Sequence, residues 1–456
     1  MNTIYKLEKE KLFSNKMIFY FIIPMAIEKA LSKLLTIADN IMVSHLGEDF
    51  LAGLSLASQI NIVIDELFMG FVLGGMILVT QLLGSNQDTN SARKIASTLL
   101  TFLTLISLFI SMIVFFCSHN IISLLYGQLN TQSHNSAITY LKIIALTYPM
   151  QVIYLCCTDL FRAMKNSKTP MKVSIVMNII NILCNYIFIY QFHMGVVGAA
   201  LGTLVARYFS TIIIFLLLCN RRNVVYFEIN TRIDFSSLKR VLFLGIPTAT
   251  DKGMFQLGKL GVASILSTFG SVQIAANVIV SNIDLLIELI PDLVAIASTT
   301  IIGHCVGAKD LKKVKYYTKK LMFIGILSTL FIMPLILSII CILHHLYSVS
   351  NEVWHLAMIL TMITYPSMIL FYVPSFTLAN ILRTIGDVKF VMTISTLSMW
   401  VFRFGGSCIL AKYFGLGVIG IKIAMVIDWA FRSILFLTRY KNGKWQKSKV
   451  QSIKAT

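Results

Sequence analysis

Hydrophobic residues in this chain are grouped into long runs separated by short polar connections. Twelve runs can be counted, and each is long enough to cross the roughly 30 Å of hydrocarbon in a bilayer as a helix. Their approximate limits are residues 16–42, 51–80, 95–118, 137–160, 171–191, 195–219, 240–262, 274–303, 321–343, 354–380, 390–410 and 416–438. The pattern predicts an all-α polytopic membrane protein with twelve transmembrane helices.

The first run carries ionisable residues in its interior, which is costly for a membrane-spanning helix. Within Ile23–Gly47 the sequence places Glu28, Lys29, Lys33 and Asp39. Such residues are expected to face the interior of a helix bundle or a wet cavity. Glu28 and Asp39 are eleven residues apart, about three helical turns, so their carboxylates should share one face, roughly 16 Å apart along the axis.

Composition agrees with a membrane protein and weakens a competing interpretation. Of the 456 residues, 57% are hydrophobic and 13% are charged, with a mean hydropathy of +0.79, whereas a soluble protein carries about 25% charged residues. A net charge of +19 is also typical of proteins that bind nucleic acid. Here the basic residues lie between the hydrophobic runs, where membrane topology explains them, so no nucleic-acid partner is expected.

The basic residues also predict the orientation in the membrane, because Lys and Arg are retained in cytoplasmic loops. They occur before the first run and in every second connection, whereas the other connections carry almost none except Lys412. The even number of runs then places both termini in the cytoplasm. We expect a multi-pass protein of the plasma (inner) membrane with a basic tail at residues 439–456.

An internal repeat divides the chain into two halves. At a constant offset of 223 residues, Ile23-Pro24 matches Ile246-Pro247, Glu28 matches Asp251, and Asp65 matches Glu288. Six runs per half preserve the orientation, so the halves are predicted to be parallel repeats. The expected organisation is a cytoplasmic amino terminus at 1–15, an N-lobe at 16–219, a cytoplasmic linker at 220–239 and a C-lobe at 240–438.

Two six-helix repeats around a central cavity are typical of secondary transporters. The sequence contains no P-loop pattern GxxxxGK[ST], so ATP is not the expected energy source. It also lacks HExxH, and its eight histidines show no arrangement typical of metal catalysis. Enzymatic activity is therefore not expected.

Several segments resemble the MATE (multidrug and toxic compound extrusion) family of transporters. ADNIMVSHLG ends the first run, FRAMKNSKTPM follows the fourth at 161–171, and GIPTATDKGMFQLGKL at 245–260 and TTIIGHCVGAKD at 299–310 resemble the corresponding parts of the second half. The resemblance spans nearly the whole chain. It implies a two-lobed fold and cation-coupled efflux of organic compounds.

The resemblance also implies roles for particular residues of the amino-terminal half. Asp39 stands where the family has a first-helix acid implicated in cation binding, and Pro24 where that helix bends in some members. Asn181 and Asn185 match a polar pair on the fifth helix, and Thr203 matches a sixth-helix hydroxyl beside them. Some members have Asp in place of Asn185, so the site here has one carboxylate fewer.

The amide residues can be interpreted in two ways. Asn178, Asn181 and Asn185 are spaced to share one helical face. Their neutral oxygens suit a hard cation such as sodium, and Na⁺ at Asp39 is the one metal ion that we expect. Interhelical hydrogen bonding, which is common for Asn in membrane helices, is the alternative. Thr203 can likewise return a hydrogen bond to its own helix.

The charged clusters near the start of each half also leave alternatives open. Glu28 and Asp251 are candidate residues of a substrate cavity, or they are neutralised by buried partners. A complete cation site in the second half is not expected, because the family position on the seventh helix is Phe255 and the run 354–380 has no acid. The lysines nearby, Lys29, Lys33, Lys252 and Lys259, also fit a flippase for lipid-linked oligosaccharides.

Together these observations predict a secondary antiporter. It would export organic, cationic or amphipathic compounds in exchange for Na⁺ or H⁺, with Asp39, Asn181, Asn185 and Thr203 binding the coupling cation and Pro24 acting as a hinge. No cofactor is expected. The expected partners are a small organic substrate and membrane lipid, with the protein acting as a monomer.

Overall fold

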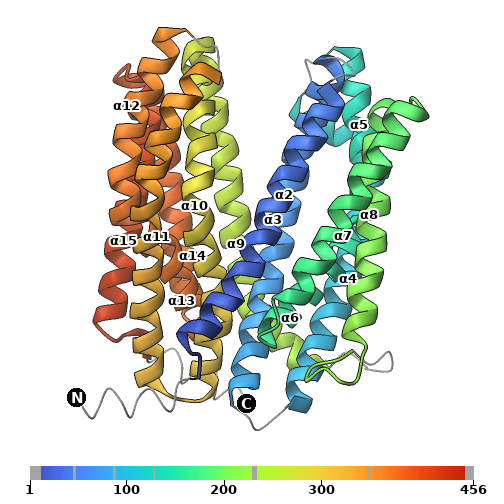
Figure 1. Ribbon diagram of the computed structural model, residues 1–456, viewed down its shortest axis with the longest axis vertical. Helices are drawn as coiled ribbons and strands as arrows, with labels where there is room; N and C mark the ends of the chain where they lie inside the picture. Colours follow the sequence, from blue (N-terminus) through green and yellow to red (C-terminus); the bar gives the residue numbers. More distant parts are fainter. Residues whose placement is uncertain are drawn as a thin grey trace. The chain divides into compact units, whose positions relative to one another are not determined.

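The structure is a computed structural model that describes residues 12–44, 48–85, 89–126, 130–227, 234–346 and 350–446. Its regular elements within these ranges are helices (Figure 1). Most of the predicted amino terminus at 1–15 and of the predicted basic tail at 439–456 lies outside them. Gly47, the end of the charged stretch of the first run, also lies outside the described residues.

The first half of the chain forms six membrane-length stretches. They are α2 (Asn15–Ser44), α3 (Glu48–Gly84), α4 (Thr89–Leu125), the pair α5 (Thr131–Ala145) and α6 (Tyr148–Ala163), α7 (Lys168–Tyr186) with a π-helical turn at Ile187–Gln191, and α8 (Gly195–Leu218). The pair α5 and α6 bends by 51°. Pro149 in the first turn of α6 has no N–H to continue the helix, which accounts for the break.

The second half forms six further stretches. They are α9 (Phe235–Leu266), α10 (Gly270–Gly307), α11 (Leu311–Leu346), α12 (Asn351–Ser367) continuing to α13 (Ala379–Ile385), α14 (Val388–Ser398) continuing to Tyr413, and α15 (Gly417–Lys441). The two continuations contain π-helical segments at Met368–Tyr372, Pro374–Leu378, Met399–Gly405 and Cys408–Tyr413. Such wide turns commonly mark functional or strained positions in helices.

Each of the twelve predicted runs lies within one of these twelve stretches of the described chain or extends beyond it by one residue, which confirms the predicted fold class. By length and apolar composition alone, seven stretches qualify as membrane spans, and the bent α5–α6 pair makes an eighth. In that count α9 and α10 form one continuous stretch. The first helix does not qualify, because Glu28, Lys29, Lys33 and Asp39 interrupt its apolar sequence.

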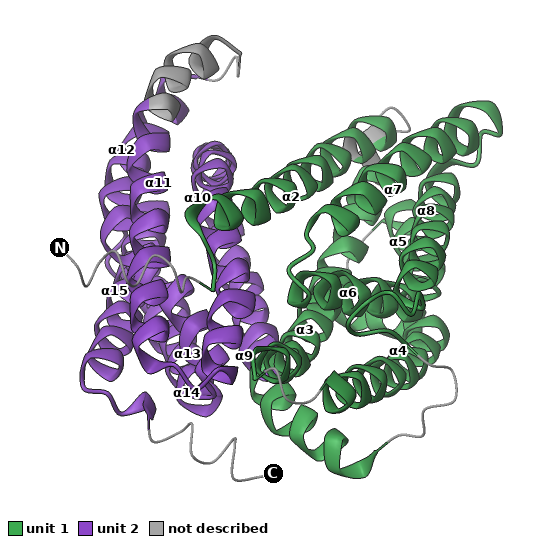
Figure 2. Ribbon diagram, turned by 60° about the horizontal axis from the view of Figure 1, so that its bottom comes forward, with its two compact units in different colours: residues 1–249 green, residues 250–456 purple. Residues whose placement is uncertain are grey.

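The described chain divides into two compact units, residues 1–249 and residues 250–456 (Figure 2). The boundary lies inside α9, ten residues beyond the predicted start of the C-lobe at residue 240. Close helix packing explains this: a Cβ atom on Gly74 of α3 would lie 2.4 Å from Cα of Gly245, and one on Gly70 would lie 2.4 Å from Cα of Ala249. The first turns of α9 therefore belong to the core of the first unit.

Polar caps begin two of the second-half helices at their loop ends. The Asp234 carboxylate accepts hydrogen bonds from the Ser237 hydroxyl at 2.6 Å and the Ser237 N–H at 3.0 Å, at the start of α9. These bonds lower the pKa of Asp234. Asp310 accepts from the Lys313 N–H at 3.0 Å at the start of α11 in the same way.

One ion pair recurs in both units and ties the first helix of each half to its fourth span. In the first unit, Nη2 of Arg162 at the end of α6 donates to both carboxylate oxygens of Glu28 on α2, at 2.9 Å each. In the second unit, Arg383 of α13 pairs with Asp251 of α9. Arginine therefore neutralises both repeat-related acids, whichever further role Glu28 and Asp251 have.

The pairing in the second unit predicts an asymmetric response to mutation. Arg383→Met should destabilise the protein by about 3 kcal/mol, because it leaves the Asp251 carboxylate buried without its arginine. The double variant Asp251→Leu/Arg383→Met should recover most of that loss, since no charge then remains uncompensated. Thermal unfolding in detergent measures both, with the exposed Lys389→Met as the control. A double variant no more stable than Arg383→Met would show that the pair is not the main partner of Asp251.

Candidate cation site and cavity in the amino-terminal unit

The predicted cation-site residues form one chain of hydrogen bonds across three helices. The Asn185 amide nitrogen donates to Oδ1 of Asp39 at 2.7 Å and to Oδ1 of Asn181 at 3.0 Å. The Asn181 amide nitrogen donates to the Thr203 hydroxyl at 3.3 Å, and that hydroxyl donates to the Ala199 carbonyl at 3.1 Å. The structure thus brings Asp39 of α2, Asn181 and Asn185 of α7 and Thr203 of α8 together.

Local helix geometry explains why these residues meet. Asn181 and Asn185 are four residues apart and lie on the same face of α7, with exposed fractions of 2% and 1%. Helix α7 packs closely against α8 and against α2. At the contact with α8 stands Gly202, where an added Cβ atom would lie 1.9 Å from Oδ1 of Asn185. Glycine at this position is what allows the amide to sit between the helices.

Two amide groups in this region are buried without complete hydrogen bonding among the described residues. Oδ1 of Asn185 has no donor, and Asn178 has no partner for either side-chain polar atom. An unpaired buried polar atom is costly and is common at functional sites. Asn178 shares the helical face but does not join the chain from Asp39 to Thr203.

A cavity of about 500 Å³ adjoins the chain. Asp39, Asn181 and Thr203 line it, and so does Glu28, about three turns away on the same side of α2. Its other lining residues include Leu35 of α2, together with Leu54, Asn61, Ile62, Tyr140, Tyr154 and Met177 from α3, α5, α6 and α7. The lining therefore combines acidic and amide groups with aliphatic and aromatic surface.

The cavity also contains an arginine and an acid that we did not assign to the site from the sequence. Arg207 of α8 donates to the Thr147 hydroxyl at 2.8 Å and attracts both Asp39 and Asp65 electrostatically. Oδ1 of Asp65 on α3 is buried without a hydrogen-bond partner among the described residues. An arginine inside the apolar run 195–219 was the available signal, since ionisable residues within membrane spans are candidate functional residues by default.

The charges of this cavity nearly cancel. Glu28 pairs with Arg162, which also pairs with Asp159 at 2.8 Å. The other charged lining residues are two carboxylates, Asp39 and Asp65, and one guanidinium, Arg207. With both acids ionised, these groups carry one net negative charge. The cavity is therefore electrostatically suited to a single monovalent cation.

In the second unit, several buried acidic residues are paired with basic side chains. Asp251 is bonded to Arg383. Asp284 pairs with Lys422 at 2.9 Å, and Asp428 pairs with Arg432 at 3.1 Å and Arg403 at 3.7 Å. These basic residues, which lie in the last two spans, were not singled out from the sequence.

Phe255 occupies a cationic environment in that unit. The guanidinium carbons of Arg403 and Arg432 lie 5.6 Å and 5.1 Å from the centre of its ring. A cation bound at this ring would face two arginines. Nearby, Asp292 accepts a hydrogen bond from the Tyr372 hydroxyl at 2.8 Å.

Pro24 lies inside α2, which continues as one helix through it from Asn15 to Ser44. It precedes Glu28 by one turn. Because proline removes one helical hydrogen bond, the helix is weakened immediately before the residue that Arg162 holds. The hinge at Pro24 stays a prediction.

A repeated bundle of membrane-length helices with a charged cavity in one half defines the chain as a polytopic membrane protein of the transporter type. The MatE family model matches residues 24–187 and again residues 247–409. The chain therefore belongs to the MatE family, and it is a membrane transporter of that family. The two matches begin at Pro24 and Pro247, which is the offset of the internal repeat.

Among curated relatives, the chain is similar to the uncharacterized transporter YisQ of Bacillus subtilis, with 25% identity over 454 residues and 97% of each chain covered. It is 25% identical over 445 residues to the probable multidrug resistance protein NorM of Thermotoga maritima, covering 94% of this chain and 92% of that protein. Human multidrug and toxin extrusion protein 1 is 23% identical over 315 residues, which cover 68% of this chain and 54% of that protein.

Solved structures share the fold. A MOP superfamily transporter from Pyrococcus furiosus superposes with a TM-score of 0.85 at 21% identity, covering 95% of this chain and 96% of that one. A MATE structure described as the bent conformation gives a TM-score of 0.86 at 20% identity, covering 96% and 97%.

The contact between Gly202 and Asn185 gives a test of the site geometry. Gly202→Ala should destabilise the protein by about 1–3 kcal/mol, because the new methyl group and the Asn185 carboxamide cannot occupy the same space. Adding Asn185→Ala should restore stability by removing the clash. Thermal unfolding is the measurement, with Gly406→Ala as the control, since its Cβ would meet Ala424 at an ordinary 3.4 Å. A Gly202→Ala protein as stable as that control would contradict this packing.

Proposed function

We propose that this protein is a secondary antiporter of the cell membrane that exports organic compounds in exchange for an inward-moving cation. The observation that carries the proposal is the hydrogen-bonded chain from Asp39 through Asn185 and Asn181 to Thr203 beside a cavity with one net negative charge. A cation and a cationic substrate would compete for that charge. Such competition drives exchange when the two ligands favour different conformations.

The coupling cation would be loaded at Asp39. In the described arrangement the Asn185 N–H group satisfies the carboxylate, while Oδ1 of the same amide is buried without a donor. A half-turn of this amide would direct Oδ1 toward Asp39 and Asn181 and exchange a donor for an oxygen ligand. The Thr203 hydroxyl and the Asn181 carbonyl oxygen would then complete an oxygen shell.

This ligand set favours sodium over a proton as the coupling ion. Sodium is a hard cation that prefers carboxylate, amide and hydroxyl oxygens, and the site offers several of them within one hydrogen-bonded group. A proton needs only one basic atom, so the neighbouring amides would contribute less. The alternative coupling ion is a proton that binds at Asp39. No cofactor other than the coupling ion is proposed.

The exported compound is proposed to be a monovalent organic cation or an amphipathic molecule. The lining of the cavity offers aromatic and aliphatic surface together with a single excess negative charge. Methionine side chains such as Met177 adapt to ligands of different shape. The names of several relatives, as multidrug resistance and multidrug and toxin extrusion proteins, support this substrate class.

The remaining features follow from the topology. We propose that the lobes are 16–219 and 240–438, that both termini are cytoplasmic, and that the protein works as a monomer in contact with membrane lipid and without a nucleic-acid partner. Pro24 would let α2 bend when Asp39 changes its occupancy. A flippase for lipid-linked oligosaccharides is the alternative function, and the relatives do not favour it.

Replacement of Asp39 is the direct test of the coupling site. Asp39→Asn should abolish efflux driven by a sodium or pH gradient in reconstituted vesicles, because no ionisable group then remains in the hydrogen-bonded chain. The amount of folded protein in the membrane should be unchanged. Asp234→Asn is the matched control, since that acid caps the start of α9 and asparagine caps equally well. Undiminished gradient-driven export by Asp39→Asn would sink the proposed role.

Arg207 gives a second, independent test. Arg207→Gln should increase the apparent affinity for the coupling cation about ten-fold, because the guanidinium no longer competes for Asp39 and Asp65. The same change should make exchange slower if the tighter cation is released more slowly. Cation dependence of transport in vesicles measures the first effect, with Arg222→Gln in the exposed loop after α8 as the control. An unchanged or weakened cation affinity would show that Arg207 does not oppose cation binding.

A further inference from the structure

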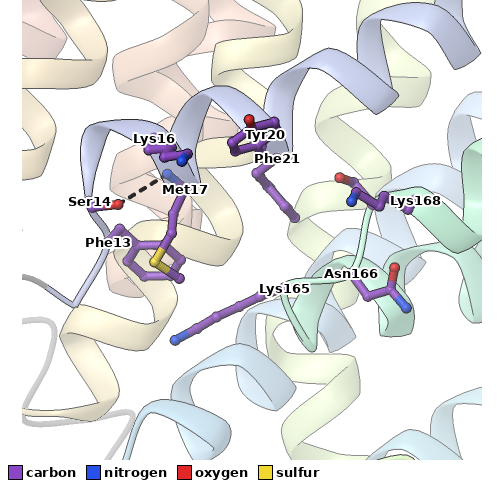
Figure 3. A pocket seen from close by; sticks show the side chains of 10 residues that line it. Phe13, Ser14, Lys16, Met17, Tyr20, Phe21, Lys165, Asn166 and Lys168 are labelled. Atoms are coloured by element: carbon purple, nitrogen blue, oxygen red, sulfur yellow. Dashed lines mark hydrogen bonds between the residues drawn. The ribbon is translucent and has the colours of Figure 1, made fainter.

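A second pocket of the first unit lies where the start of α2 meets the turn between α6 and α7. Its volume is about 360 Å³, and its ten described lining residues include three lysines and no acidic residue. Figure 3 shows Lys16, Tyr20 and Phe13 from the beginning of α2, opposite Lys165 and Lys168 from the turn. The pocket is separate from the cavity at Asp39, with which it shares no lining residue.

The pocket combines positive charge with exposed apolar surface at the start of α2. The side chains of Met17, Phe19 and Tyr20 are 45%, 63% and 54% exposed at this end of α2, although they belong to a predicted membrane span. Two long helices, α2 and α7, also begin at the pocket, at Asn15 and Lys168. The positive ends of both helix dipoles therefore add to the charge of the lysines.

The backbone of Lys165 provides independent evidence that a lysine is used here. Its φ is 64°, in the left-handed region that favours glycine. It follows the end of α6, with its N–H bonded to the Arg162 carbonyl at 2.9 Å. In the second half the N–H that bonds to the Arg383 carbonyl, also at 2.9 Å, belongs to Gly386, with φ 109°.

The two halves therefore have different residues at the same position of this turn. Arg162 and Arg383 are the equivalent arginines of the two ion pairs, and the residue three positions later is lysine in one half and glycine in the other. A lysine in this conformation is less favourable than a glycine. The Lys165 ammonium lies 4.5 Å from the centre of the Phe13 ring, at the edge of the pocket.

We propose that this pocket binds the phosphate headgroup of an anionic glycerophospholipid. Basic pockets between membrane helices on the cytoplasmic side bind such headgroups, and the exposed Met17, Phe19 and Tyr20 would contact the acyl chains. A free phosphate ion shares the headgroup chemistry but would gain nothing from this apolar surface. The proposal does not depend on the coupling mechanism at Asp39.

The test uses the full-length protein, delipidated in detergent, with phosphatidylglycerol, phosphatidylcholine or inorganic phosphate added. Native mass spectrometry measures bound lipid, and thermal unfolding measures the protection that each addition gives. The wild-type protein should bind phosphatidylglycerol more tightly than phosphatidylcholine. Equal binding of the two lipids, or equal protection by inorganic phosphate at the same concentration, would overturn the assignment to an anionic lipid.

Lys165→Gly is the decisive variant, because glycine is the residue that the equivalent turn already uses. It should fold at least as stably as the wild type while binding phosphatidylglycerol about five-fold more weakly, the effect of removing one lysine near an anionic surface. Lys168→Ala should have a similar effect, and Lys168→Arg should retain binding. Lys172→Ala, an exposed residue one turn further along α7 and outside the pocket, is the matched control.

Two results with these variants would refute the proposed lipid site. One is undiminished phosphatidylglycerol binding by Lys165→Gly and Lys168→Ala. The other is an equal loss in Lys172→Ala, which would mean that general surface charge attracts the lipid and that the pocket has no special role. Transport activity is not needed as a readout, so failure here is distinguishable from failure of the antiport proposal.

Discussion

Each unit of this transporter depends on how it accommodates charged groups among apolar helices. An isolated charge in a nonpolar interior is costly, and the cost falls when a partner of opposite charge is hydrogen-bonded to it. Arg162 with Glu28 and Arg383 with Asp251 solve this problem in the same way in both units. The pairs join the first helix of each half to its fourth span.

Apart from these two equivalent ion pairs, the two units differ in the partners of their other buried acidic side chains. The second unit matches Asp284 and Asp428 with lysine and arginine. In the first unit, the hydrogen-bond partner of Asp39 in the chain is a neutral amide, that of Asn185. A carboxylate held by amides can exchange those partners for a cation, whereas one held by arginine cannot do so without leaving a buried charge. The asymmetry therefore favours the first unit as the place of cation coupling.

The same comparison between halves explains the pocket at the start of α2. Repeats are expected to use the same residue wherever only the backbone conformation matters, and Gly386 satisfies that conformation better than Lys165 does. Where one half has lysine in place of the glycine that suits the backbone better, we infer a role for the lysine side chain. Equivalent positions of the two halves can therefore be compared, because a residue that the fold alone requires is expected in both halves.

The twelve spans, the repeat and the group of Asp39, Asn181, Asn185 and Thr203 could be predicted from the sequence, because hydrophobic runs, a constant offset and family motifs are local in the chain. The partners of the charges could not. Arg162 lies 134 residues from Glu28 in the chain, and Arg207 of α8 acts on Asp39 and Asp65 through electrostatic attraction. Side-chain distances between helices decide which buried charges are neutralised and which cavity they line. They also decide how Gly202 leaves room for the Asn185 amide. Only the tertiary structure fixes those distances.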